Sequence, residues 1–82
     1  MRSDAREVEL AKAWLAQQRP VSRVGKRFTS WHLRRMAERW HRLQGQDACI
    51  SDAAFHEAVK RMGLSTVPAG PVFMYVALEV VQ

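Results

Sequence analysis

The sequence predicts a mainly α-helical fold that ends in a small antiparallel β-hairpin. Two observations lead to this fold class. Three segments before Gly63 carry apolar residues at helical spacing, and after Gly63 the chain becomes rich in β-branched and aromatic residues. Because the chain has only 82 residues, of which 48% are apolar, we expect residues 1–82 to form one domain around one small core.

The first helix is expected to begin at Asp4, with Glu7 three residues later as its capping-box partner. We expect Pro20 to end this helix, since a proline pushes the preceding residue out of the α region. The stretch PVSRVGKRFT, which starts at this proline, predicts a short edge strand or an extended linker. The apolar face of the helix consists of Val8, Leu10, Ala11, Trp14 and Leu15.

The second helix is expected to lie between Ser30, as its cap, and Gly45, a glycine that can take the left-handed conformation. Trp31 lies outside the apolar stripe of this helix. We expect it to pack beneath the preceding linker, against Val24 or Phe28, because aromatic side chains are usually buried. The predicted core face of the helix consists of Leu33, Met36, Ala37, Trp40 and Leu43.

The third helix is expected to begin after Ser51, its cap, and to end at Gly63. Cys49, just before it, is interpreted as a small buried hydrophobic residue. His32 and His56 are expected to be exposed polar residues. The predicted core face of the third helix consists of Phe55, Ala58, Val59 and Met62.

The last part of the chain predicts a hairpin. Residues 64–67 form its short first arm, the PAGP cluster supplies the turn, and residues 72–81 form a longer second arm. The whole order of elements is typical of a winged helix, a helix-turn-helix variant in which the hairpin is the wing. The alternative is a three-helix bundle with a frayed tail, but this would leave the apolar residues 72–81 unburied.

The positive charge is concentrated in one part of the chain. Formal net charge is +5, yet residues 19–42 hold eight basic residues and one acid, a net of +7, while the other 58 residues hold a net of −2. Such asymmetry indicates an acidic partner, most often nucleic acid, although a solvated basic face is the alternative. The candidate binding residues are Arg19, Arg23, Lys26, Arg27, His32, Arg35, Arg39, Arg42, His56, Lys60 and Arg61.

Other kinds of function have little support in the sequence. It contains no nucleophile elbow, phosphate-binding loop or zinc-protease motif, so we do not expect an enzyme or a cofactor. His32, His41, Cys49 and His56 are 9, 8 and 7 residues apart, which matches no standard zinc spacing, so no metal site is predicted. A single cysteine and the lack of a signal peptide or apolar span predict a soluble, cytoplasmic protein.

Three stretches resemble motifs of a known group. Ser30-Trp31-His32-Leu33-Arg34-Arg35, with Ala37-Glu38, resembles a Ser-aromatic-x-Leu-Lys-His-x-x-Glu signature. Ile50-Ser51-Asp52-Ala53-Ala54-Phe55, with Met62-Gly63-Leu64, resembles a Val-Ser-Asn-Gly-Ala-Phe run followed by Gly-Phe. Gly70-Pro71, with Phe73 and Tyr75, resembles a Gly-Pro-Asn-x-aromatic ending.

Together these stretches, which cover about residues 30–76, resemble a group of short, mostly uncharacterised plasmid and phage proteins. They are more loosely similar to winged-helix modules of phage and plasmid replication proteins. The resemblance implies a fold and a mobile-element origin but no mechanism. The chain departs from the pattern at Val72, which replaces Asn, and at Asp52-Ala53, which replace Asn-Gly. An acid at the start of the third helix repels phosphate, which makes base reading by that helix less favourable.

These observations lead to three functional hypotheses. In the first, the protein binds duplex DNA with low sequence specificity, or acts as a regulator. In the second, it is a protein–protein interaction module, for example a phage inhibitor that docks its basic face on a host defence complex, with the edge of the 72–81 strand open to a second copy or a partner. In the third, it is a winged-helix dimerisation module whose charge only keeps it soluble.

Overall fold

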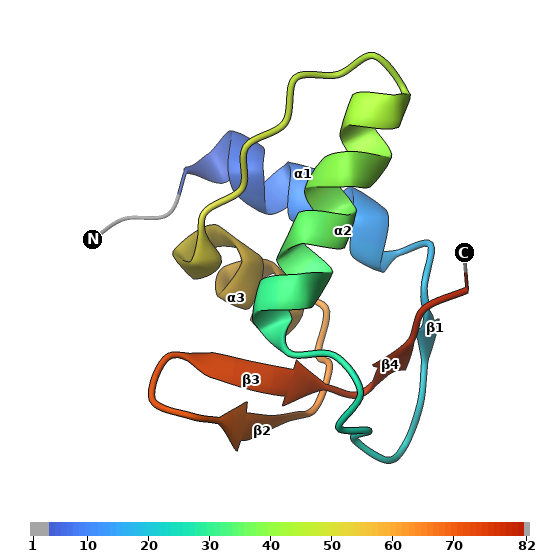
Figure 1. The fold of residues 1–82 in the computed structure, drawn as a ribbon, viewed down its shortest axis with the longest axis vertical. Coiled ribbons are helices and arrows are strands. Elements are labelled where there is room, and N and C mark those ends of the chain that lie inside the picture. Colours follow the sequence, from blue (N-terminus) through green and yellow to red (C-terminus); the bar gives the residue numbers. More distant parts are fainter. Residues whose placement is uncertain (1–3, 82) are drawn as a thin grey trace.

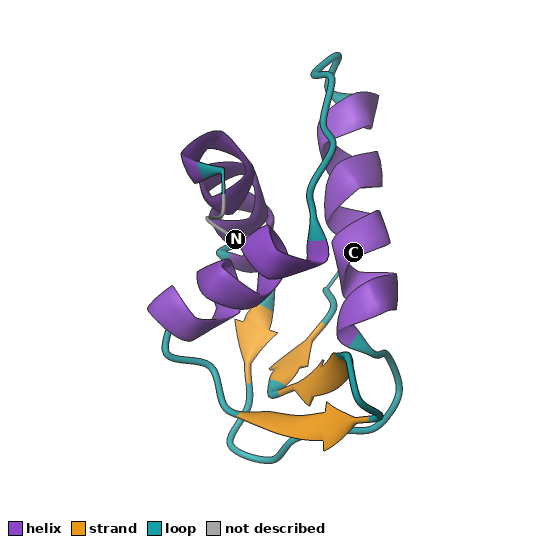
Figure 2. Ribbon diagram, turned by 90° about the vertical axis from the view of Figure 1, so that its left-hand side faces the viewer, coloured by secondary structure: helices purple, strands orange, loops and turns teal. Residues whose placement is uncertain are grey.

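The computed structural model describes residues 4–81 and has the expected fold class, three helices and a small antiparallel β region (Figure 1). The helices gather in one layer and the strands lie together at one end of them (Figure 2). In chain order the elements are α1 (Ala5–Leu15), β1 (Arg19–Pro20), α2 (Ser30–Leu43), α3 (Asp52–Arg61), β2 (Thr66–Ala69), β3 (Phe73–Val76) and β4 (Leu78–Glu79).

Helix α1 begins where the sequence predicted, but its capping box is only half formed. The Asp4 carboxylate accepts hydrogen bonds from the backbone N–H groups of Arg6 and Glu7. The Glu7 carboxylate does not return to Asp4. It accepts a hydrogen bond from the Ser51 backbone N–H at 2.7 Å, which connects the start of α1 to the start of α3. The prediction that Pro20 ends α1 is wrong, because the helix ends at Leu15 and Pro20 lies in β1.

The core lies where the three helices meet, with β3 beneath them. Trp14 of α1 and Phe55 of α3 are its largest buried side chains, and their ring centroids lie 6.5 Å apart. Burial of each such side chain stabilises the fold by roughly 1.5–3 kcal/mol. Leu33 of α2 and Val76 of β3 complete the contact between the helices and the strands. The predicted core faces of α1 and α3 are confirmed, except that Leu10 is half-buried and Met62 is exposed.

The predicted core face of α2 is wrong at its C-terminal end. Leu33 and Ala37 are buried, whereas Met36 and Trp40 are only partly buried against the core, and Leu43 is 74% exposed. Polar side chains instead occupy part of the inner side of α2. The segment between α2 and α3 runs back along the helix, so its backbone groups require polar partners there. The buried polar residues on this face are Ser30, Glu38 and His41.

Helix α3 begins as expected, because the Ser51 hydroxyl accepts a hydrogen bond from the Ala54 backbone N–H. The helix ends at Arg61, and Gly63, just beyond the C-cap residue Met62, has a φ of +72° in the left-handed region where a glycine is favoured. The prediction that Cys49 is buried is wrong, since this side chain is exposed. Its neighbours Ala48 and Ile50 are buried, because side chains alternate sides along an extended segment.

The hairpin forms between β2 and β3, with Val67 paired to Tyr75 and Gly70 at the turn with a φ of +94°. Its first arm starts two residues later than predicted and includes Pro68 and Ala69, which were predicted to lie in the turn. The apolar run 72–81 is not one strand. Its first part, β3, pairs with β2. At Ala77 the N–H donates to the Ser65 carbonyl and the carbonyl accepts from the Val21 N–H, and β4 then pairs antiparallel with β1. Because the tail is paired within the chain, the alternative of a helix bundle with a frayed tail does not hold.

Candidate nucleic-acid interface

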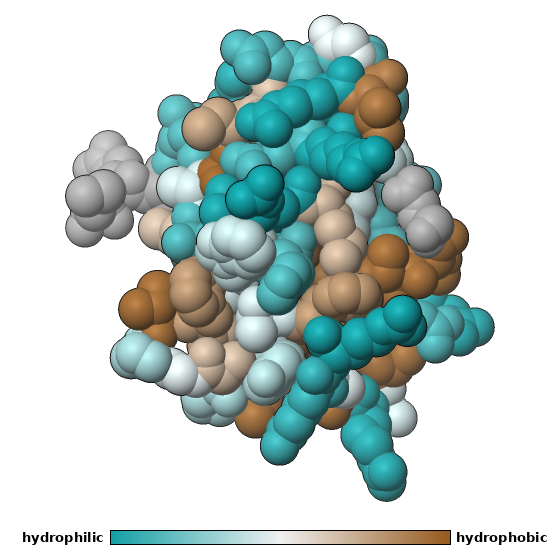
Figure 3. Space-filling view, viewed as in Figure 1, coloured by the Kyte–Doolittle hydropathy of each residue, from teal (hydrophilic) through white to brown (hydrophobic). Residues whose placement is uncertain are grey.

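The outer face of α2 carries a row of exposed basic side chains, which we call the outer stripe: His32, Arg35, Arg39 and Arg42. These residues follow one another at steps of three and four, so they share one side of the helix. Figure 3 shows long hydrophilic side chains gathered over α2 on this face of the molecule. The sequence therefore placed this row correctly on the surface.

Two aromatic contacts order the N-terminal end of the outer stripe. The Arg35 guanidinium carbon lies 4.9 Å from the centroid of the Trp31 ring, a cation–π contact. His32 meets the same ring edge to face, with centroids 5.0 Å apart, and its Nδ1 lies 3.2 Å from the Thr29 hydroxyl. At the other end, Arg42 donates a hydrogen bond to the Ala48 carbonyl at 2.9 Å.

Trp31 is half-buried and belongs to the outer face of α2 rather than to the linker contact that we expected. The Phe28 ring packs near His32 instead, at a centroid distance of 6.2 Å. Beside Trp31 the surface is hollowed by an open groove of about 400 Å³, in which Met36 supplies further apolar surface. The positive side chains of the outer stripe and Glu38 line the rest of this groove.

The linker between β1 and α2 continues the positive charge. Arg23, Lys26 and Arg27 are exposed, and the Arg27 guanidinium lies 5.1 Å from the centroid of the Phe28 ring. The linker leads directly into the N-terminus of α2 (Figure 1). The two groups of basic residues are therefore consecutive in the chain.

Ion pairs within the protein remove two of the eight basic residues in the 19–42 segment. Arg19 pairs with Glu79 across β1 and β4, and Arg34 pairs with Glu38 and Asp52. Within the part of the chain that the structure describes, the other six have no carboxylate within 4.0 Å. These six are Arg23, Lys26, Arg27, Arg35, Arg39 and Arg42.

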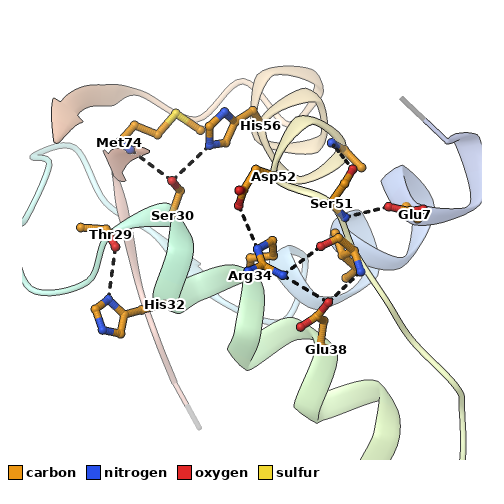
Figure 4. Close-up of polar contacts among 12 residues, drawn as sticks. Glu7, Thr29, Ser30, His32, Arg34, Glu38, Ser51, Asp52, His56 and Met74 are labelled. Carbon is orange, nitrogen blue, oxygen red and sulfur yellow. Dashed lines mark hydrogen bonds and ion pairs between the residues drawn. The ribbon is translucent and has the colours of Figure 1, made fainter. Parts of the chain in front are cut away.

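Arg34 lies on the inner side of α2, at the centre of a partly buried polar network (Figure 4). Its Nη1 donates to Glu38 Oε2 at 3.3 Å and to the Ile50 carbonyl at 3.1 Å, and Glu38 accepts the Ile50 N–H at 2.8 Å. Arg34 Nε lies 2.9 Å from Asp52 Oδ1, but the two are not aligned for a hydrogen bond, so this contact is an ion pair. The network joins α2 to the start of α3.

The prediction that Ser30 caps α2 is wrong. Ser30 is the first residue of the helix, and Thr29 occupies the N-cap position. Ser30 as a whole is 1% exposed. Its hydroxyl accepts a hydrogen bond from the Met74 backbone N–H at 3.1 Å and lies 3.1 Å from His56 Nε2 (Figure 4). This one hydroxyl therefore connects α2, α3 and β3.

The three candidate binding residues of α3 are less available than those of α2. His56 is only partly exposed, because its ring turns toward Ser30, so the prediction that it is a freely exposed side chain is wrong. Arg61 donates to Glu57 at 2.8 Å, four residues earlier on the same helix. Lys60 is exposed, and no carboxylate of the described chain lies within ion-pair distance of it. The structure thus leaves one free cation on α3.

Sequence reasoning missed the role of His41, which is 4% exposed. Its Nε2 lies 2.7 Å from the Leu10 carbonyl of α1, and its Nδ1 lies 2.7 Å from Gln46 Oε1 in the following loop. A signal was present, because His41 follows Leu33 and Ala37 at steps of four on the inner side of the helix.

No family model, curated protein or solved structure matches the chain. Among residues 4–81, no three His, Cys, Asp or Glu side chains come close enough together to hold a metal ion. In the same range, no helix combines the length and the apolar character that crossing a membrane requires.

Proposed function

We propose that the protein binds duplex DNA through the outer stripe and the linker, with little sequence preference. The observation that supports this proposal is the group of six basic side chains between Arg23 and Arg42 that have no acidic partner in the described chain. Arg34, by contrast, is paired with acids on the inner side of α2. A polyanion would supply the partners that these six lack.

The dimensions of the outer stripe suit a nucleic-acid backbone. From His32 to Arg42 the helix rises by about 15 Å, at roughly 1.5 Å per residue. A duplex carries about one negative charge per 1.7 Å of its axis, so the stripe faces several phosphates at once. Contacts of this kind fix the position of a protein on DNA but do not read the sequence.

The element order is typical of a winged helix, in which the third helix enters the major groove. Two features argue against base reading here. On α3 the carboxylates of Asp52 and Glu57 are paired with Arg34 and Arg61, which leaves Lys60 as the free cation. The hairpin residues 66–73 include no charged side chain. We therefore place the phosphate contacts on α2 and the linker, and assign to α3 at most a minor role.

The resemblance to short plasmid and phage proteins is part of the same proposal. A small, basic, weakly selective DNA-binding protein of a mobile element would coat or organise DNA, or act as a regulator beside a more selective partner. In that setting affinity comes from charge, and specificity is supplied elsewhere.

Fluorescence anisotropy with a labelled random-sequence duplex tests the proposal, at about 50 mM and about 200 mM salt. Six phosphate contacts predict a log–log salt slope near −5, at about −0.9 for each contact. The absence of binding at the lower salt concentration rejects the proposal. A slope near zero rejects it as well, because binding would then not be electrostatic.

The second candidate is a protein partner with an acidic surface, including a host defence complex inhibited by a phage protein. The groove beside Trp31 and Met36 supports it, since Trp, Met and Arg are enriched at protein interfaces. Affinity capture from a nuclease-treated lysate tests this candidate. A partner that is captured only when nuclease is omitted would be bridged by nucleic acid, and this result would support DNA binding instead.

A homodimer through the 72–81 run has less support. Tyr75 in β3 already pairs with Val67 on one side and bridges to Thr29 on the other. Association through an edge of β3 would therefore have to displace one of these contacts. Light scattering on the free protein tests for such a dimer, and a monomer mass excludes it.

A further inference from the structure

A second concave site lies away from the outer stripe, between the linker and the C-terminal strands. It is a cavity of about 360 Å³, open on one side. This volume falls within the range typical of small-molecule pockets, roughly 300–1,000 Å³. Its apolar lining comprises Val21, Phe28, Leu33, Val76, Leu78 and Val80.

The depth of this cavity is set by the core. Leu33 of α2 and Val76 of β3 border the cavity, but they are 1% and 3% exposed and so belong to the packed interior. Leu78 and Val80 are only partly buried against the core. An apolar group that entered the cavity would cover this remaining exposed surface, which is favourable in proportion to the area removed from water.

The rim of the cavity is positively charged. Arg23 and Arg27 line it from the linker, and neither has a carboxylate partner within the described residues. The carboxylate of Glu79, which also lines the cavity, is engaged by Arg19 and does not neutralise them. Two guanidinium groups therefore lie beside an apolar recess, and no carboxylate among residues 4–81 pairs with them.

We propose that this cavity binds a small amphipathic monoanion, a carboxylate attached to an apolar tail. The tail would enter the recess between Phe28 and Val80, and the carboxylate would pair with Arg23 and Arg27. A guanidinium donates two parallel hydrogen bonds to a carboxylate, which makes this pairing directional. Duplex DNA would use this site only in part, because its phosphates could pair with the two arginines but would leave the partly exposed side chains of Phe28, Leu78 and Val80 uncovered.

Isothermal titration calorimetry of the full chain with decanoate tests this inference. Decanoate binds with one-to-one stoichiometry, whereas acetate, which lacks the tail, and decylammonium, which has the opposite charge, bind at least about tenfold more weakly. The amide signals of residues 76–80 shift on titration in heteronuclear NMR spectra. The absence of saturable decanoate binding overturns the inference, and so does equal binding of decylammonium.

Matched variants separate this site from the charge of the protein as a whole. Arg23→Gln with Arg27→Gln weakens decanoate binding by about tenfold or more, and Val80→Asn weakens it by a similar factor. Arg35→Gln with Arg39→Gln removes the same charge from the outer stripe and leaves decanoate binding within about twofold. An equal loss in both double variants overturns the inference, because the anion would then bind to charge alone.

The inference does not depend on the proposed DNA binding, and the same variants distinguish the two. The outer-stripe variant weakens DNA binding and not decanoate binding, whereas the variant at Arg23 and Arg27, which removes two of the six proposed phosphate contacts, weakens both, and Val80→Asn weakens decanoate binding alone. If the protein does not bind DNA but binds decanoate saturably through the linker arginines, the cavity assignment stands and the DNA proposal fails. If it binds DNA but not decanoate, only the cavity assignment fails.

Discussion

Arg34 and Arg35 are neighbours in the sequence and have opposite surroundings in the structure. Arg34 points to the inner side of α2, where Glu38, Asp52 and the Ile50 carbonyl surround its guanidinium. Arg35 points outward and stacks on Trp31, with no carboxylate of the described chain within ion-pair distance. The same comparison extends along the whole helix, with Ser30, Glu38 and His41 bonded inside and the outer stripe exposed.

The difference shows that the formal charge of a segment is a poor measure of the electrostatic field that the segment presents to a partner. Residues 19–42 hold eight basic residues, but two of them, Arg19 and Arg34, are already paired with acids of the protein and so add less to the attraction of a partner. Of the two, only Arg34 is paired on the inner side of α2, since the Arg19 pair lies on the surface. Changes on the inner side of α2 should therefore alter the free energy of unfolding. Changes on the outer side should alter binding.

The largest effect on stability is expected for Glu38→Ala. This change leaves the Arg34 guanidinium and the Ile50 N–H without their shared acceptor, and loss of one partner of a buried ion pair costs about 3 kcal/mol. Urea denaturation followed by circular dichroism measures it. The matched control is Glu57→Ala on α3, which breaks the more exposed pair with Arg61 and costs less than about 0.5 kcal/mol. Equal costs for the two variants would contradict the structural role of the inner side.

A smaller loss, about 2 kcal/mol, is expected for His41→Ala, since it removes a buried ring and leaves the Leu10 carbonyl unpaired. The control is His32→Ala on the outer stripe, where surface substitutions stay within about 0.5 kcal/mol. Thermal and urea unfolding of the two variants, measured side by side, test this contrast. A His41→Ala protein as stable as His32→Ala would show that the inner histidine contributes nothing.

Ser30→Ala should destabilise the protein by about 1 kcal/mol, because the Met74 N–H and His56 lose a common partner. Ser22→Ala, at an exposed linker position, serves as the control and should leave the midpoint of urea unfolding unchanged. If Ser30 acted only as a surface residue, both variants would unfold at the same denaturant concentration.

The smallest effect on stability is expected for the double variant Arg35→Gln with Arg39→Gln, within about 0.5 kcal/mol of the parent protein. These two side chains lie outside every ion pair of the described chain, so the folded state loses little when their charge is removed. Urea unfolding measures this directly. A cost above about 1.5 kcal/mol, the value of a typical internal hydrogen bond, would show that the outer stripe is needed for folding.

Much of the fold could be predicted from the sequence, because helical periodicity and capping residues are local signals. Ser51 and Gly63 delimit α3 as expected, and the glycine-containing turn placed the hairpin. What could not be predicted depends on contacts between distant segments. The bond from Ser51 to Glu7 and the pairing of β4 with β1 join residues more than forty positions apart in the sequence.

The candidate site was also predicted only in part, because the sequence shows local spacing but not contacts between distant segments. Helical spacing alone places the outer stripe on one face, and the exposure of all four of its residues is confirmed. Spacing could not show that Arg19 has a strand partner in Glu79, or that the His56 ring turns toward Ser30. Those pairings exist only once the helices and strands are packed.

The central claim is that α2, rather than α3, would meet a nucleic-acid backbone. It is tested most directly by the log–log salt slope of duplex binding for two matched double variants, Arg35→Gln with Arg39→Gln on α2 and Lys60→Gln with Arg61→Gln on α3. We expect the α2 variant to reduce the slope by about 1.8, which corresponds to two lost phosphate contacts, and the α3 variant to leave it unchanged. A reduced slope for the α3 variant, with no change for the α2 variant, would contradict the account.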